Sequence, residues 1–315
     1  MAYELTDKKV WVAGHRGMVG SALMRRLERE NCVLLTADRQ SVDLTRQSEV
    51  EEWIKINKPQ VILLAAAKVG GIHANSSYPA DFIYDNLMIE TNIIDAAWRF
   101  NIEKLLFLGS SCIYPRQVTQ PIKEDTLLSG PLEQTNEWYA VAKIAGIKMC
   151  QAYRRQYGCD LISAMPTNLF GPGDNFHPEN SHVPAALLDR FHKAKMLGLD
   201  EVTIWGSGTP RREFLYIEDL ADACIFLIRH YSEEEIINIG VGRDISIGEF
   251  ALLISNITGF NGRIVFDTNH PDGTPQKLLD VSRLTKMGWQ ATTGLDQGLK
   301  SYYEWYLKNI GNLRT

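Results

Sequence analysis

The sequence predicts an α/β protein: a doubly wound parallel sheet followed by a smaller mixed α/β region. Three observations carry this prediction. Short apolar runs alternate with helical patterns through the first half of the chain. The run 61–67 has no polar interruption, as expected of a parallel strand buried on both faces. A glycine-rich turn lies between the first strand and the first helix.

The elements follow in a regular order. Strand patterns cover 9–13, 32–36, 61–67, 105–108 and 161–165. Helical spacing covers 21–30, 50–56, 82–100 and 140–157. The alternation of strands and helices ends at Asn168-Leu-Phe-Gly-Pro-Gly, where glycine and proline interrupt the pattern. We therefore expect the chain to cross into a second domain there.

The later chain predicts shorter strands at 202–205, 236–239 and 263–266, with helices at 185–195, 218–229, 247–257 and 295–307. We expect residues 1–170 to form a nucleotide-binding domain, and the chain to return to this domain over about 214–240. A substrate domain would comprise 171–213 and 241–315.

The composition excludes several kinds of partner. Charged residues make up 23% of the chain and the net charge is −5, so no general basic field is available for nucleic acid or anionic membrane. The five cysteines are scattered, which argues against a disulfide framework or a metal site. No apolar run approaches the ~18 residues that span a bilayer. We therefore expect a cytoplasmic enzyme that acts on a small molecule.

The first turn reads Ala13-Gly14-His15-Arg16-Gly17-Met18-Val19-Gly20. Glycines at this spacing let the backbone approach a pyrophosphate, which the N-terminus of the following helix then binds. Such a trio alone could be an ordinary tight turn. Its place between strand and helix is the context of a Rossmann-type dinucleotide site.

The end of the second strand bears on the choice of cofactor. An acid there favours NAD and an arginine favours NADP, and Asp38 and Arg39 are adjacent. Arg16 adds a second guanidinium suited to a phosphate. We expect NADP(H), the alternative being that both arginines are ordinary surface charges.

Tyr139 and Lys143 lie four residues apart near the start of a predicted helix, which places the phenol and the ammonium on one face. A nearby ammonium favours phenolate, and the neutral phenol can protonate a developing alkoxide. Ser110 and Cys112 follow the strand 105–108, at the sheet edge where ligands bind. Alone, this cysteine could equally be a small buried apolar residue.

Together, the glycine loop, Ser110 and Tyr139-x-x-x-Lys143 resemble the extended short-chain dehydrogenase/reductase superfamily. The likeness extends over nearly the whole chain to a branch of NADPH-dependent 3,5-epimerase/4-reductases that act on a GDP-sugar. It rests on the strings at 13–20, 64–72, 78–84, 108–115, 165–172, 174–178, 205–210 and 272–277.

The resemblance implies that GDP-4-keto-6-deoxy-D-mannose is epimerised at C3 and C5 and then reduced at C4, giving GDP-L-fucose. It makes Cys112 the base and His182 the acid of the epimerisation. Ser110, Tyr139 and Lys143 would hold the C4 oxygen and complete the reduction. It further implies a homodimer.

The same likeness supplies the binding residues. For NADP(H) they are Gly14, Arg16, Gly17, Met18, Val19, Gly20, Arg39, Leu108, Gly109, Ser110, Ser111, Lys143, Pro166, Thr167, Asn168, Leu169 and His182. For the sugar nucleotide they are Arg190, Trp205, Arg212, Asp272 and Lys277.

Two alternatives stay open. A 4,6-dehydratase or 4-epimerase would share the cofactor loop and Tyr139/Lys143. However, dehydratases typically carry an Asp-Glu pair after the strand-end serine or threonine, where this chain has Cys112-Ile113. A catalytically silent NADP-binding protein would usually lack the tyrosine or the lysine.

Overall fold

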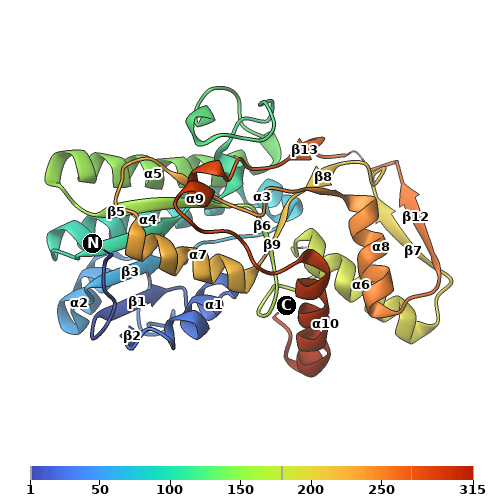
Figure 1. Cartoon of the computed structure of the whole chain (residues 1–315), viewed down its shortest axis with the longest axis horizontal. Helices are drawn as coiled ribbons and strands as arrows, with labels where there is room; N and C mark the ends of the chain where they lie inside the picture. The colour runs from blue at the N-terminus through green and yellow to red at the C-terminus, as the bar shows by residue number, and fades with distance from the viewer. Residues whose placement is uncertain (1, 179, 271, 315) are drawn as a thin grey trace.

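The computed structural model describes residues 2–178, 180–270 and 272–314. Its larger part is a six-stranded parallel sheet in the order β10-β5-β4-β3-β1-β2 (Figure 1). The strands are β1 (Lys9–Ala13), β2 (Val33–Leu35), β3 (Val61–Leu64), β4 (Lys104–Leu108), β5 (Leu161–Pro166) and β10 (Ile237–Ile239). The strand order reverses between β1 and β3, so the ligand crevice of such a sheet is expected at their carboxyl ends.

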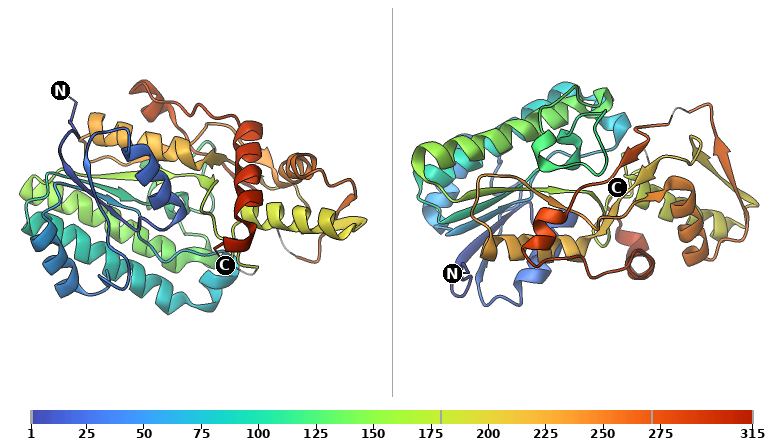
Figure 2. Two further views of the ribbon diagram at one scale, coloured as in Figure 1. Left: turned by 90° about the horizontal axis from the view of Figure 1, so that it is seen from below. Right: turned by 45° about the horizontal axis from the view of Figure 1, so that its top comes forward.

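Alternate side chains of each central strand enter two different cores. In β3, Val61 and Leu63 face one core, whereas Ile62 and Leu64 face the other. The first core is covered by α1 (Met18–Leu27) and α7 (Ile217–His230). The second is covered by α2 (Gln47–Asn57), α4 (Pro79–Arg99) and α5 (Glu137–Tyr157). Figure 2 shows the sheet between these two layers of helices. Burial on both faces explains the continuous apolar runs.

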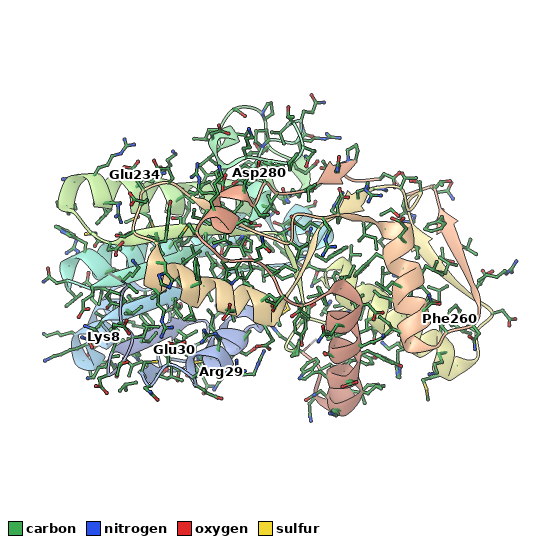
Figure 3. The ribbon with its side chains drawn as sticks, viewed as in Figure 1. Lys8, Arg29, Glu30, Glu234, Phe260 and Asp280 are labelled. Atoms are coloured by element: carbon green, nitrogen blue, oxygen red, sulfur yellow. The ribbon has the colours of Figure 1, made fainter. Side chains whose placement is uncertain are left out.

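A buried acid joins the two helices of the first layer. Glu30, labelled in Figure 3, lies just beyond α1 and is 5% exposed. It accepts hydrogen bonds from Arg26 of α1 and Arg229 of α7. Arg26 also donates to Asp222 of α7 at 2.7 Å. Because a carboxylate is rarely buried without partners, these arginines are what lets Glu30 lie inside.

The smaller part has its own core. It is formed by α6 (Val183–Leu197), α8 (Ile247–Thr258) and α10 (Leu295–Asn309), together with β7 (Glu201–Trp205) and β12 (Arg263–Asp267), which pair in parallel. Between the two parts, β6 (Asn168–Phe170) pairs with β9 (Phe214–Tyr216). A third small sheet places β8 (Arg211–Arg212) between β11 (Ile245–Ser246) and β13 (Gln276–Lys277).

The predicted doubly wound parallel sheet is confirmed, with differences of detail. α1 begins at Met18 rather than at residue 21, because the glycine turn leads directly into the helix. The unpredicted elements are short: α3 (Ile72–Ser77), α9 (Ser282–Lys286), η1 (Ser111–Ile113), η2 (Glu124–Thr126), η3 (Gln134–Asn136), η4 (Ile310–Asn312) and the strands β6, β8, β9, β11 and β13. None of the helices in the described part of the chain combines the length and apolar character that a membrane crossing needs.

Candidate active site and cofactor cleft

The glycine loop fits a dinucleotide. Gly14 has φ = 91°, and a Cβ there would stand 2.7 Å from the backbone of Ala66, so only glycine suits this turn beside the end of β3. Gly17 N–H donates to Gly14 O at 3.0 Å, and Gly17 is the N-cap of α1. Within residues 17–21, all of which the structure describes, no side chain caps the helix and none is acidic. Its free N–H groups are therefore available to a pyrophosphate.

Other predicted cofactor residues lie along the same sheet edge. Met18 and Val19 open α1, Arg39 is exposed after β2, and Leu108 ends β4. Gly109 and Ser111 follow β4, and Pro166 ends β5 with Thr167 directly after it.

Asn168 and Leu169 form most of β6, where the Asn168 amide donates to Glu213 O at 2.8 Å. Because the strands are parallel, their carboxyl ends meet at one edge.

Cys112 is placed by the short helix η1. Ser110 is its N-cap, and the Cys112 N–H approaches Ser110 Oγ at 3.4 Å. Burial raises the pKa of the Cys112 thiol, whereas the ammonium of Lys277, the Ser110 hydroxyl and Lys143 lower it. Two cations and a hydroxyl near the sulfur therefore offset part of the effect of burial, which leaves the pKa of the thiol raised.

Tyr139 and Lys143 lie on α5 as predicted. The Lys143 Nζ stands 5.8 Å from the centre of the Tyr139 ring and 4.7 Å from that of Phe107 in β4. Burial raises the pKa of the Tyr139 phenol well above its ordinary value, and Cys112 and Glu90 raise it further. Because the Cys112 thiol affects the pKa of the Tyr139 phenol and the Lys143 ammonium affects that of the thiol, the three groups share one site.

His182 comes from a different element, the start of α6. It is the N-cap of α6, where its carbonyl accepts from Ala186 N–H at 3.0 Å. Gly71 N–H donates to Asn180 O at 3.1 Å, so the loop after β3 supports the segment before the histidine. His182 is solvent-exposed, yet desolvation by its surroundings lowers the pKa of the imidazole. Among the described residues no hydrogen bond or ion pair connects its ring to Cys112 or Tyr139, so the pairing of Cys112 and His182 as base and acid stays a prediction.

Two predicted substrate residues line one groove. Arg190 of α6 and Trp205 at the end of β7 border a groove of about 490 Å³ between α6 and β7. Arg190 Nη1 donates to Thr203 O at 2.7 Å. The Trp205 indole is 65% exposed and stacks on His270 with ring centres 4.4 Å apart. An exposed aromatic face beside a guanidinium suits a planar base or a sugar and its phosphate.

The other three predicted substrate residues differ in role. Lys277 of β13 pairs in register with Arg212 of β8, and it lies close enough to Cys112 to affect its thiol. Asp272 is tied into the turn after β7, where it accepts from Ser207 N–H at 2.9 Å and Ser207 Oγ at 2.6 Å. Asp272 therefore shapes the loop that precedes Arg212, besides any contact with a ligand.

Sequence reasoning missed two residues near the site. Glu90 of α4 lies 2.8 Å from Lys143. Arg314 comes close to the glycine loop, since a Cβ on Gly17 would stand 3.9 Å from its Nη1. Arg314 O accepts from Phe176 N–H at 2.7 Å, which fixes the C-terminal segment there. Neither residue belongs to a motif, so only the fold reveals its position.

The fold and the Tyr139/Lys143 site define the class of protein. Residues 10–240 match the model of the NAD dependent epimerase/dehydratase family, and the chain belongs to that family. The predicted resemblance to the extended short-chain dehydrogenase/reductase superfamily is thereby confirmed.

Individual relatives are more specific. A GDP-L-fucose synthase of Sinorhizobium fredii is 58% identical over 310 residues, covering 98% of this chain and 99% of the relative. The GDP-L-fucose synthase of Escherichia coli (strain K12) is 51% identical, covering 98% and 100%. A crystal structure of a GDP-L-fucose synthetase from Naegleria fowleri bound to NADP matches with a TM-score of 0.93 at 28% identity, covering 100% of this chain and 98% of that one.

Proposed function

We propose that the chain converts GDP-4-keto-6-deoxy-D-mannose into GDP-L-fucose, by epimerisation at C3 and C5 and reduction of the C4 ketone with NADPH. The observation that carries this function is the cluster of Ser110, Cys112, Tyr139 and Lys143 at the carboxyl end of β4, with Lys277 facing the thiol. The relatives named GDP-L-fucose synthase support the same reaction.

Epimerisation needs a base and an acid for each carbon beside the ketone. Lys277 and Lys143 stabilise a Cys112 thiolate, which removes the proton from C3 or C5. The resulting charge moves to the C4 oxygen, where Ser110 and Tyr139 donate hydrogen bonds. His182 returns a proton to the opposite face. A base and an acid that are not in contact suit opposite faces of a sugar ring placed between them.

Reduction follows at the same carbonyl. Bound NADPH supplies the hydride to C4. The Tyr139 phenol gives its proton to the C4 oxygen, and Lys143, 5.8 Å from its ring, stabilises the phenolate that is left. Ser110 Oγ holds the oxygen in place.

The sugar nucleotide would lie between the two parts of the molecule. Arg190 and Trp205 would bind the nucleotide end along their groove. Arg212 and Lys277, side by side on β8 and β13, would bind the end nearer the thiol. Asp272 would hold the connecting loop. The predicted division of the chain into two domains, its homodimeric state and its cytoplasmic location stay predictions.

Incubation with NADPH and GDP-4-keto-6-deoxy-D-mannose in deuterium oxide tests this function. We expect loss of nicotinamide absorbance, and uptake of deuterium at C3 and C5 of the product. Reduction without deuterium uptake would contradict the epimerase half while sparing the reductase half. Deuterium uptake without reduction would contradict the reductase half.

A further inference from the structure

A buried ion pair stands directly behind the Tyr139/Lys143 pair. Lys143 Nζ lies 2.8 Å from Glu90 Oε1, and the two side chains are only 2% and 1% exposed. Apart from this contact with Lys143, neither Glu90 oxygen has a polar partner within the described part of the chain, so the lysine ammonium is what the carboxylate faces. Burying two charges is costly and often adds nothing to stability, which makes a purely structural role a weak explanation.

The packing of α4 on α5 is shaped around this carboxylate. Gly146 lies one turn beyond Lys143 on α5. A Cβ at Gly146 would stand 2.8 Å from Glu90 Oε2 and 2.5 Å from Phe107 Cζ. The missing side chain therefore leaves the space that lets Glu90 reach the ammonium.

The position of Glu90 has an electrostatic consequence for Tyr139. An unpaired ammonium close to a phenol favours the phenolate. When a carboxylate lies 2.8 Å from that ammonium, the two charges largely cancel at the phenol, which then keeps its proton.

We propose that Glu90 is a positioning residue that offsets the charge of Lys143 and so keeps Tyr139 protonated until negative charge develops on the substrate oxygen. This inference rests on the proposed reduction, because a reductase needs a proton donor at this position. An enzyme that begins by oxidising an alcohol needs the phenolate instead.

The remaining ionisable neighbours do not reverse this effect. Tyr139 faces Cys112 from η1 and Glu90 from α4, and both raise the pKa of the phenol after burial has done so. Lys143 faces it from its own helix. Cys150, two turns beyond Lys143, also feels the charge of Glu90.

The test is Glu90→Gln, which keeps the shape and removes the charge, with Glu90→Asp as the conservative variant. Hydride transfer is followed as a function of pH for each protein. We expect the rate of the Gln variant to fall at a pH about 1 to 3 pH units below that of the wild type, with the Asp variant between them. If Glu90 served folding alone, its replacement would lower the rates without changing the pH at which the rate falls.

A second readout needs neither substrate nor cofactor. The tyrosinate absorbance of each protein is titrated, and the same variant carrying Tyr139→Phe is subtracted so that only Tyr139 contributes. We expect Tyr139 to ionise at lower pH in the Gln variant than in the wild type. Because this titration does not use the sugar nucleotide, it separates failure of the inference from failure of the proposed reaction.

The proposed role of Glu90 would be overturned if the Gln variant and the wild type lose hydride transfer at the same pH and ionise Tyr139 at the same pH. If the Gln variant does not fold, as judged by circular dichroism, the Asp variant decides. A Tyr139 titration in the Asp variant that equals the wild type would then overturn the proposal, and ionisation at lower pH would support it.

Discussion

Arg16 Nη2 lies 3.0 Å from Asp38 Oδ2, so the glycine loop and the end of the second strand are joined by an ion pair. Asp38 also accepts the N–H groups of Gln40 and Ser41 at 3.1 and 2.9 Å through Oδ1. The acid that would favour NAD is thus engaged by the protein, and Arg16 lies beside the end of the second strand, where we predict that the 2′-phosphate binds.

We therefore predict that Arg16→Ala and Arg39→Ala each weaken the binding of NADPH by about 10- to 100-fold, as expected for loss of a charge-assisted hydrogen bond. NADH, which lacks the 2′-phosphate, should bind nearly as before. Fluorescence titration of both cofactors measures this. An equal loss for NADH would show that the arginines support the loop rather than the phosphate.

The large sheet could be predicted from the sequence because its signal is local. Buried parallel strands are continuous apolar runs, as in Val61–Leu64. The glycine-rich turn indicates where the first helix begins. The two-residue strands β8, β11 and β13 could not, because two residues carry no periodicity. Yet β8 and β13 place Arg212 and Lys277 side by side.

Only the site residues that belong to a sequence motif could be predicted. The motifs are the Tyr-x-x-x-Lys spacing of Tyr139 and Lys143, and the end of a predicted strand, which Ser110 and Cys112 follow. Glu90 is one acid in an ordinary helical pattern, and its importance depends on how α4 packs on α5. Its detection required the tertiary structure.

Cys112→Ser and Tyr139→Phe should separate the two halves of the reaction. We expect Cys112→Ser to suppress deuterium exchange at C3 and C5 by about 10²- to 10⁴-fold, because it removes the base. Tyr139→Phe should chiefly suppress hydride transfer, because it removes the proton donor. Mass spectrometry of the sugar and nicotinamide absorbance report the two steps.

The control for both variants is the affinity for NADPH, which should stay within about twofold of the wild type because neither group is predicted to bind the phosphates. Identical behaviour of the two variants in both assays would contradict this division of roles.

Arg314 is predicted to contribute to cofactor binding through its closeness to Gly17. We expect Arg314→Ala to weaken NADPH binding by about 10-fold, the effect of one lost contact with a phosphate. Lys308→Ala, the same change of charge at an exposed position of α10, is the matched control and should have little effect. Equal affinities of the two variants would show that Arg314 does not contact the cofactor.

Asp174 gives a prediction about pH and stability. Burial raises the pKa of its carboxyl to about 7, although the N–H of Asn175 and the Tyr302 hydroxyl donate to it at 2.8 and 3.1 Å. Because this pKa exceeds the unfolded value of 3.8, the native state binds more protons between these two pH values. The contribution of Asp174 to stability therefore falls as the pH rises from about 4 to about 7.

Asp174→Asn should remove this dependence. The variant is expected to gain stability relative to the wild type as the pH rises through that window. Between pH 5 and pH 8 the gain is at most roughly 3 kcal/mol, because about two pH units of the window lie above pH 5 and each is worth about 1.4 kcal/mol. Urea unfolding of both proteins at pH 5 and pH 8 measures the difference, and the comparison cancels the titration of all other groups. A difference in unfolding free energy that stays constant between the two pH values would mean that Asp174 is ionised in the native state throughout, its hydrogen bonds having outweighed its burial.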